Sequence, residues 1–213
     1  MLGWTLVRDD ASGRRRARIV EVEAYGGPED RASHARFGAT ARTSVMFGPA
    51  GHAYVYRVYG MHDCLNVVTG PTGSASALLI RAVEPIEGVE IMRVDRVALS
   101  ARRRAARSAD GQRRTARRLA ATPDQRLASG PGRVAAAFGL DTGWTGLDLL
   151  GPASPLRLEA AAVDGARRDI ATGPRIGVAY AGSEWAGRPW RLWVADSPAV
   201  SGPGAAPRSR RST

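Results

Sequence analysis

The chain has 213 residues, of which 44% are apolar and 24% are charged. This length and balance are those of one globular domain with a sizeable core, and they exclude a disordered chain and two full-sized domains. All 31 basic residues are arginine, and with 20 acidic residues they give a net charge of +11, which predicts a polyanion as partner. Because the chain contains no lysine, Schiff-base chemistry would have to use the N-terminal amine.

A single cysteine, Cys64, excludes an internal disulfide and any metal site built on several cysteines. His34, His52 and His62 lie near it in sequence, but without HxxxH or CxxC spacing, so we predict no metal site. No run reaches the length of a membrane span, and the N-terminus lacks the order of a signal peptide. We therefore expect a cytoplasmic protein.

The N-terminal part predicts a β-hairpin that leads to an acidic residue. An apolar segment at 2–7 is followed by a turn at 9–13, and an alternating run of β-branched and acidic residues then reaches Glu23. The loop at 26–51 is long, rich in glycine and carries His34, which is typical of an active-site loop. A carboxylate at a strand end beside such a loop makes Glu23 the first candidate for catalysis.

Three further strands are predicted at 53–59, 64–69 and 77–83, joined by short turns that contain glycine. Neighbouring strands with short connections favour an antiparallel sheet. A helix is then predicted from Pro85 to about Val97, because proline and acidic residues favour a helix N-terminus.

The region 102–118 contains eight arginines and one acid without a sustained apolar face. We interpret residues 100–126 as a solvated, mobile insertion that is compatible with non-specific phosphate contact. The segment 130–133 predicts the start of a short helix whose first amides can face a phosphate. Later strands are predicted at 156–159, 175–180 and 190–194. We expect residues 1–201 to form a single domain and 202–213 to be a disordered basic tail.

Glu21 and Glu23 lie two positions apart on one strand and share a face, which is a geometry that a retaining glycoside hydrolase could use. Alternating acids on a solvent-facing strand are common, so the pair alone is weak evidence. Four of the five tyrosines also lie near His34 in sequence. A wall of tyrosine and histidine can hold a flat base, since stacking contributes about 1–3 kcal/mol per base. Tyr59, beside a glycine, is placed to protrude and to fill the gap that a base leaves in a duplex.

The chain carries a series of distinctive blocks in the order 19–25, 27–30, 33–34, 46–49, 54–56, 59–66, 79–85, 130–133, 174–178 and 190–193. Together they resemble the alkyladenine (3-methyladenine) DNA glycosylase family over nearly the whole chain outside the arginine-rich insertion and the tail. The resemblance implies an α+β fold, in which a curved antiparallel β-sheet is flanked by helices, similar to the C-terminal domain of formyltransferases.

The resemblance also implies the reaction. A monomeric, cofactor-free enzyme of this family flips an alkylated or deaminated purine out of double-stranded DNA and hydrolyses the N-glycosidic bond, leaving an abasic site. Glu23 would deprotonate or orient the attacking water, and Arg81 would help to hold it. Tyr25, His34 and Tyr56 would line the base pocket.

Other residues would contact the DNA or select the base. Tyr59 and Met61 would intercalate, and Asn66 would crowd the exocyclic amine of undamaged guanine. A phosphate contact is assigned to three residues of the predicted helix start, Gly130, Gly132 and Arg133.

Two alternatives stay open. One is a non-catalytic nucleic-acid-binding module of related fold, and the other is a glycoside hydrolase that uses Glu21 and Glu23. Abasic sites that disappear in Glu23→Gln and survive in Glu21→Gln would indicate a DNA glycosylase. Binding without product would favour the module, and release of sugar from an oligosaccharide would favour the hydrolase.

Overall fold

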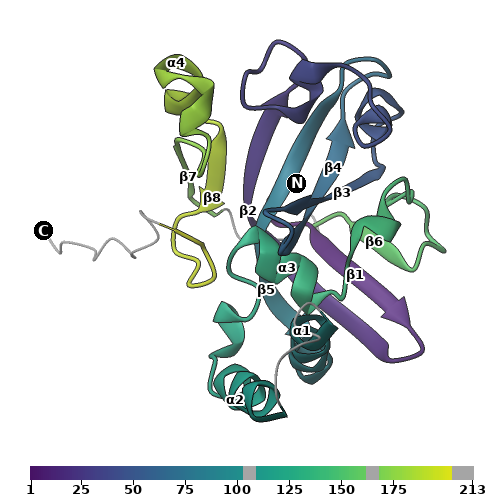
Figure 1. Cartoon of the computed structure of the whole chain (residues 1–213), viewed down its shortest axis with the longest axis vertical. Helices are drawn as coiled ribbons and strands as arrows, with labels where there is room; N and C mark the ends of the chain where they lie inside the picture. Colours follow the sequence, from purple (N-terminus) through teal and green to yellow (C-terminus); the bar gives the residue numbers. More distant parts are fainter. Residues whose placement is uncertain (103–108, 162–167, 203–213) are drawn as a thin grey trace, which may run out of the picture.

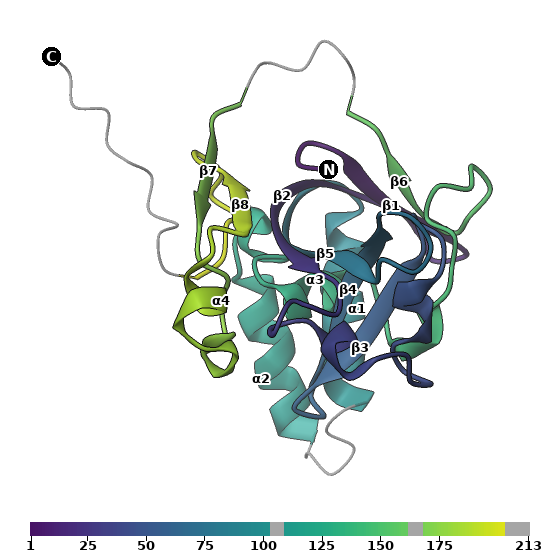
Figure 2. The ribbon, with the colours of Figure 1, turned by 90° about the horizontal axis from the view of Figure 1, so that it is seen from above.

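The computed structural model describes residues 1–102, 109–161 and 168–202. It confirms the α+β class, because one antiparallel sheet curls into a half-barrel with α-helices packed against it (Figures 1 and 2). The strands are β1 (Thr5–Asp10), β2 (Gly13–Gly26), β3 (Ala53–Val58), β4 (His62–Thr69), β5 (Ser76–Glu87), β6 (Leu156–Glu159), β7 (Ile170–Gly173) and β8 (Arg191–Val194).

The described α-helices are α1 (Val89–Arg102), α2 (Ala109–Ala120), α3 (Pro131–Ala137) and α4 (Ser183–Gly187). Short 3-10 turns are η1 (His34–Phe37), η2 (Ser44–Phe47), η3 (Asp124–Arg126), η4 (Thr142–Trp144) and η5 (Ala179–Ala181). The likeness to the C-terminal domain of formyltransferases stays a prediction.

Strand β2 is the centre of the sheet. The strand order is β3-β4-β5-β2-β1-β6, and β8 pairs with both β2 and β7. The first half of β2 forms the predicted hairpin with β1, in which Asp10 pairs with Gly13. Its second half pairs with β8, so that Glu21 lies opposite Trp193, while β5 runs along the other edge of β2. The second half of β2 therefore has a strand on each edge.

Both faces of the second half of β2 are covered. Ile19 and Val22 pack into the main core, together with Phe138 from the end of α3. Val20 packs in a separate cluster with Ala199 from the C-terminal segment. Register shifts interrupt the β2–β5 ladder around Glu21, as β-bulges do, so burial does not alternate here. Acidic residues in this stretch are consequently enclosed by protein.

The structure corrects the predicted start of the first helix. Pro85 lies in β5, opposite Ala17 and next to a register shift. Strand β4 accompanies β5 only between Ser76 and Leu79, so the missing N–H of Pro85 removes no bond to β4. Gly88, with a φ of 75°, then turns the chain into α1.

The predicted strand at 175–180 is also wrong. Gly177 has a φ of 79°, and the backbone N–H of Ile176 donates to a side chain of β2 instead of a neighbouring strand. The predicted strands at 156–159 and 190–194 are confirmed as β6 and β8, the latter starting at Arg191.

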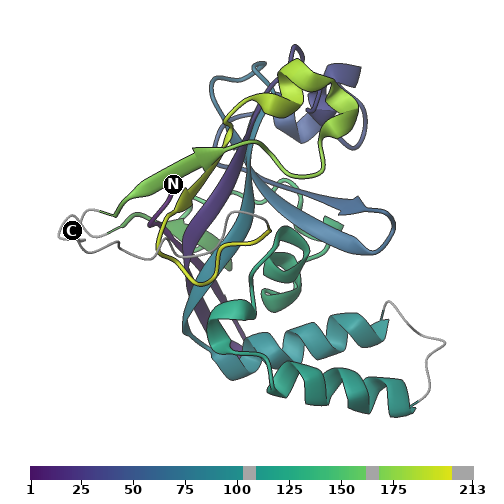
Figure 3. The same cartoon turned by 90° about the vertical axis from the view of Figure 1, so that its left-hand side faces the viewer.

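The described side chains of residues 109–120 are mostly exposed, as predicted for a solvated insertion, and the mobility of residues 100–126 stays a prediction. Residues 109–120 form α2, which packs beside α1, as Figure 3 shows. The buried side chain of Leu119 provides an apolar contact that a count of arginines does not reveal. Residues 103–108 and the predicted disordered tail from 203 onward lie outside the described residues.

Candidate active site

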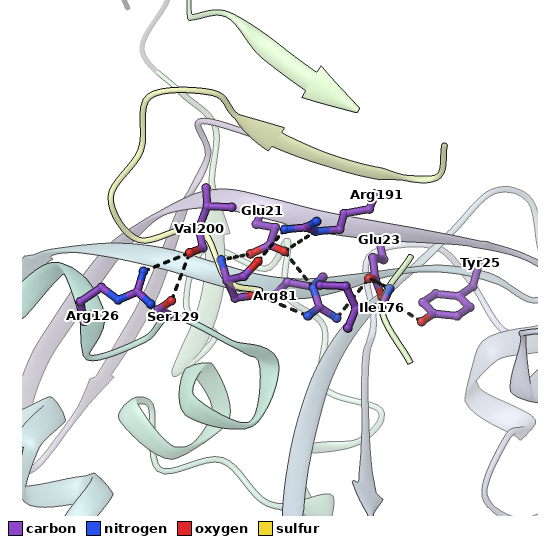
Figure 4. A network of polar contacts seen from close by, with 10 residues as sticks. Glu21, Glu23, Tyr25, Arg81, Arg126, Ser129, Ile176, Arg191 and Val200 are labelled. Atoms are coloured by element: carbon purple, nitrogen blue, oxygen red, sulfur yellow. Dashed lines mark hydrogen bonds and ion pairs between the residues drawn. The ribbon is translucent and has the colours of Figure 1, made fainter. Parts of the chain in front are cut away.

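Glu23 is fully buried near the end of β2 and accepts bonds from three separate parts of the chain. Its Oε1 accepts the backbone N–H of Ile176 at 2.7 Å and lies 3.1 Å from Nη1 of Arg81. Its Oε2 accepts the hydroxyl of Tyr25 at 3.0 Å (Figure 4). The carboxylate is therefore held in one orientation by groups up to 153 positions away.

The second acid of β2, Glu21, is also fully buried. Its Oε1 accepts Nε of Arg81 at 2.9 Å and Nε of Arg191 at 2.7 Å. Its Oε2 accepts the backbone N–H of Ser201 at 2.7 Å. Glu21 is thus a structural anion between two guanidinium groups, and neither a solvent-facing acid nor an acid open to a sugar.

Arg81 connects the two carboxylates. Burial on its own would lower the pKa of this guanidinium, but the charges of Glu23 and Glu21 outweigh burial and raise its pKa above the ordinary value. Ser201 adds a further contact, since Nη2 of Arg81 donates to its hydroxyl at 3.3 Å. A cation fixed on both sides in this way supplies a stationary positive charge beside Glu23.

Aromatic side chains lie on the side of Glu23 that carries its hydrogen bond with Tyr25. The rings of His34 and Tyr56 meet edge to face at 4.5 Å, and those of Tyr54 and Tyr56 lie 5.5 Å apart. Tyr25, His34 and Tyr56 are each partly exposed, whereas Tyr54 is buried. The three predicted base-contacting residues thus remain partly accessible.

The aromatic residues are uncharged at neutral pH. Burial, followed by the charges of Arg42 and Arg36, lowers the pKa of His34 to about 4. Burial raises the pKa of Tyr54 to about 12, and burial also raises the pKa of Tyr56. Nδ1 of His34 is 2.9 Å from the hydroxyl of Tyr54, which fixes the imidazole ring. Neutral rings of this kind attract a flat cation through their faces.

The loop that carries His34 is anchored by an ion pair that the sequence did not reveal. Asp30 and Arg175 are both buried, and two guanidinium nitrogens reach the carboxylate at 2.5 and 3.0 Å. Arg175 also donates to the carbonyl of Ala24 and stacks 4.8 Å from the ring of Tyr25. Asp30 and Arg175 lie in the distinctive blocks 27–30 and 174–178, but no local sequence pattern indicates that they form an ion pair.

The hairpin between β3 and β4 ends in an exposed tip. Tyr59 is 84% exposed and Met61 is 56% exposed, so both protrude as predicted. Tyr59 and Gly60 have φ values of 51° and 67°, and the connection is shorter than predicted because His62 already belongs to β4. A non-glycine residue in the left-handed region, such as Tyr59, costs on the order of 1–3 kcal/mol in backbone strain. Strained residues of this kind are often found at functional sites.

Asn66 lies on β4 and is buried, with its Nδ2 donating to the carbonyls of Tyr54 and Cys64 at 3.0 and 3.4 Å. The predicted phosphate segment forms the start of α3. Pro131 has no N–H, and the amides of Arg133 and Val134 already donate to the carbonyl of Gly130. The exposed guanidinium of Arg133 is therefore the main group that this segment offers to an anion.

No described group of three or more histidine, cysteine, aspartate or glutamate side chains is arranged to hold a metal ion. Within the described ranges, no helix has both the length and the apolar character needed to cross a membrane.

Comparison with known proteins decides the family. A sequence model described as methylpurine-DNA glycosylase matches residues 1–198. The chain belongs to the methylpurine-DNA glycosylase family. The family match includes Glu23, Arg81 and the residues around them, and it ends before Ser201.

Relatives in this family carry the provisional name 3-methyladenine DNA glycosylase. The one from Nocardia farcinica is 44% identical over 98% of this chain and 86% of its own length. Those from Myxococcus xanthus and Methanocella arvoryzae are 43% and 45% identical, each over 94% of this chain, and over 84% and 87% of their own lengths. The resemblance to the alkyladenine DNA glycosylase family is thus confirmed.

Proposed function

We propose that this protein is a monofunctional 3-methyladenine DNA glycosylase that excises alkylated or deaminated purines and leaves an abasic site. The observation that carries the proposal is the contact of Glu23 with Arg81 beside the partly exposed rings of Tyr25, His34 and Tyr56. A carboxylate can activate water and stabilise a sugar cation, a fixed guanidinium can help to hold that water, and an aromatic wall can hold a purine.

The three donors around Glu23 leave one acceptor site of its carboxylate for a water molecule. An ionised carboxylate has about four acceptor sites, and the three donors around Glu23 occupy three of them. A water in the remaining site would donate one proton to Glu23 and point its oxygen lone pair at the sugar. Glu23 then takes up that proton as the water attacks. Its negative charge also stabilises the positive charge that develops on the sugar when the purine leaves.

The aromatic residues account for the choice of substrate. Tyr25, His34 and Tyr56 would hold a flipped purine, and their uncharged rings attract an alkylated purine that carries positive charge. Such a base is already a good leaving group, so no strong acid is needed opposite Glu23. Asn66 would exclude undamaged guanine by crowding its exocyclic amine.

The DNA-facing residues follow from the same arrangement. Tyr59 and Met61 at the exposed tip would fill the gap left by the flipped base. Arg133 would contact a phosphate from the start of α3, next to Gly130 and Gly132. The substrate is double-stranded DNA, and we expect the enzyme to act as a cytoplasmic monomer without a cofactor.

The test uses duplex DNA that contains one hypoxanthine or one alkylated purine, with abasic sites revealed by alkaline cleavage. We expect product from the wild type and a single-turnover rate about 10²–10⁴-fold lower for Glu23→Gln, with binding to the duplex retained. Glu29→Gln is the matched control, because this acid lies six positions away and is exposed. Binding without any product from the wild type would favour the non-catalytic module.

The absence of lysine makes the monofunctional assignment testable. Borohydride added during the reaction traps a Schiff base between an amine and the opened sugar. We expect no trapped complex with the lesion duplex and no strand cleavage before alkali. A trapped complex that disappears when the N-terminal amine is acetylated would contradict the assignment.

A further inference from the structure

Helix α2 carries a basic face that the proposed reaction does not use. Arg113, Arg114, Arg117 and Arg118 are all exposed. At 100° per residue these positions fall within about 140° of the helix circumference, so the four side chains form one stripe. We call this stripe, Arg113, Arg114, Arg117 and Arg118, the α2 arginine face.

The opposite side of α2 faces the protein. Leu119 is buried and Thr115 is half-buried, and both lie on the far side of the helix from the arginines. Helix α2 packs against α1, which in turn packs against α3 (Figure 3). Packing through this side fixes the direction of the α2 arginine face toward solvent.

The arginines of this face are largely uncompensated. Arg114 pairs with Asp110, four positions earlier in the helix. Among the described residues, no carboxylate forms an ion pair with Arg113, Arg117 or Arg118. Surface arginines elsewhere in the described chain are often paired, as Arg14 is with Asp9. Three like charges on one helix face, without a carboxylate partner in the described ranges, are unfavourable on their own and favour an anionic partner.

The α2 arginine face is connected to the start of α3 through α1, which contacts both helices. The start of α3 touches β4, since a Cβ placed on Gly132 would lie 3.0 Å from Cβ of His62, close to Tyr59 and Met61. Arg133 follows directly. Burial, and then the charges of Arg133, Arg118 and Arg93, lower the pKa of Arg96 to about 10, so charges from both α3 and α2 act on this residue of α1.

We propose that the α2 arginine face binds phosphates of duplex DNA beyond those next to the lesion. This inference rests on the proposed function, which brings the duplex to the hairpin tip and to Arg133. Helix α2 has 12 residues and is roughly 18 Å long, whereas duplex DNA carries one charge per about 1.7 Å of axis. Several phosphates can therefore lie within reach of the face.

Such contacts would be independent of sequence. Arginine side chains bind phosphate oxygens without reading bases, so they increase affinity for undamaged and damaged DNA alike. Duplex DNA is favoured over an acidic protein because α2 packs on α1, and α1 packs on α3, whose Arg133 is proposed to hold a phosphate of the duplex. The expected benefit is a longer residence on undamaged DNA during the search for damage.

The experiment compares two variants of the full chain with equal change in charge. Arg113→Gln/Arg117→Gln/Arg118→Gln removes three charges from the α2 arginine face, and glutamine keeps good helix propensity. Arg14→Gln/Arg16→Gln/Arg18→Gln removes three charges from β2, where each arginine has an acidic partner. Affinity for an undamaged duplex is measured between 50 and 200 mM salt.

The measured quantity is the slope of the logarithm of the DNA association constant against the logarithm of the salt concentration. Each lost phosphate contact reduces the magnitude of this slope by about 0.9. We expect a reduction of about 2–3 for the α2 variant and a smaller change for the β2 control. Equal slopes for the α2 variant and the wild type, or equal reductions in both variants, would overturn the inference. Tighter binding of the wild type to an acidic protein than to DNA would also overturn it.

The excision assay separates this inference from the proposed function. At saturating enzyme, the α2 variant should excise the lesion at the wild-type single-turnover rate, because α2 does not touch Glu23 or Arg81. A wild type that forms no abasic sites but shows the slope difference would refute the proposed function and leave DNA binding by α2 in place.

Discussion

Glu21 and Glu23 are joined through one guanidinium: Nε of Arg81 donates to Glu21 at 2.9 Å, and its Nη1 lies 3.1 Å from Glu23. Glu23, the catalytic candidate, and Glu21 therefore contact the same guanidinium. Glu21 fixes Arg81, and Arg81 faces Glu23. This relationship revises the expectation that Glu21→Gln would leave excision unchanged.

Glu21→Gln should reduce both stability and excision. The neutral amide leaves Arg81 and Arg191 buried without their shared anion, and breaking a buried pair costs about 3–5 kcal/mol. A displaced Arg81 should slow the single-turnover rate on the order of 10²-fold, even at temperatures where the variant is folded. Urea unfolding and single-turnover excision measure the two effects. Glu159→Gln, at a partly exposed pair, is the control and should change stability by less than about 1 kcal/mol.

The C-terminal segment should be needed for excision as far as Ser201. The backbone of Ser201 donates to Glu21, its carbonyl accepts Nη2 of Arg191 at 2.5 Å, and the carbonyl of Val200 accepts Arg126 at 3.2 Å (Figure 4). A chain that ends after Ser197 lacks these contacts and should lose excision at saturating enzyme. A chain that ends after Gly202 keeps them and should retain the wild-type rate. Equal single-turnover rates for the two truncated chains would contradict this role of the segment.

Tyr59→Ala should weaken binding to lesion DNA more than binding to undamaged DNA. The side chain is 84% exposed, so its removal should leave the free energy of unfolding nearly unchanged. Loss of stacking in the duplex should cost about 1–3 kcal/mol with the lesion substrate. Fluorescence anisotropy with the two duplexes measures this difference. Tyr59→Phe keeps the ring and should behave like the wild type, whereas equal losses on both duplexes would exclude intercalation by Tyr59.

His34 should make stability depend on pH between about 6.5 and 4. The unfolded chain binds the imidazole proton with the ordinary pKa of 6.5, whereas burial and two nearby arginines lower the folded pKa to about 4. The unfolded state binds more protons in this window, so stability is present above pH 6.5 and falls as pH decreases toward 4. Urea unfolding of the wild type and His34→Gln from pH 7 to 4 isolates the effect. Parallel curves for the two proteins would show that His34 does not titrate in this way.

Local patterns in the sequence determined the early hairpin, the start of α3 and most of the strands, but not β7 (Ile170–Gly173). Alternation, glycine turns and a proline at the first helical position are signals carried by adjacent residues. They also placed Glu23 at a strand end beside a loop, and Tyr59 at a turn. Arg175–Tyr180 showed the limit of such signals, because an apolar run that resembles a strand instead places the amide of Ile176 against Glu23.

Tertiary structure alone decided which side chains meet. The partners of Glu21 are 60, 170 and 180 positions away, and Arg175, the ion-pair partner of Asp30, is 145 positions away, so no local pattern encodes the pairs. Burial of Glu21 depends on β8 and the C-terminal segment covering β2, and the direction of the α2 arginines depends on α1. Hydrophobic periodicity shows which face of a helix or strand is buried. Which other element packs against that face depends on the fold of the whole chain.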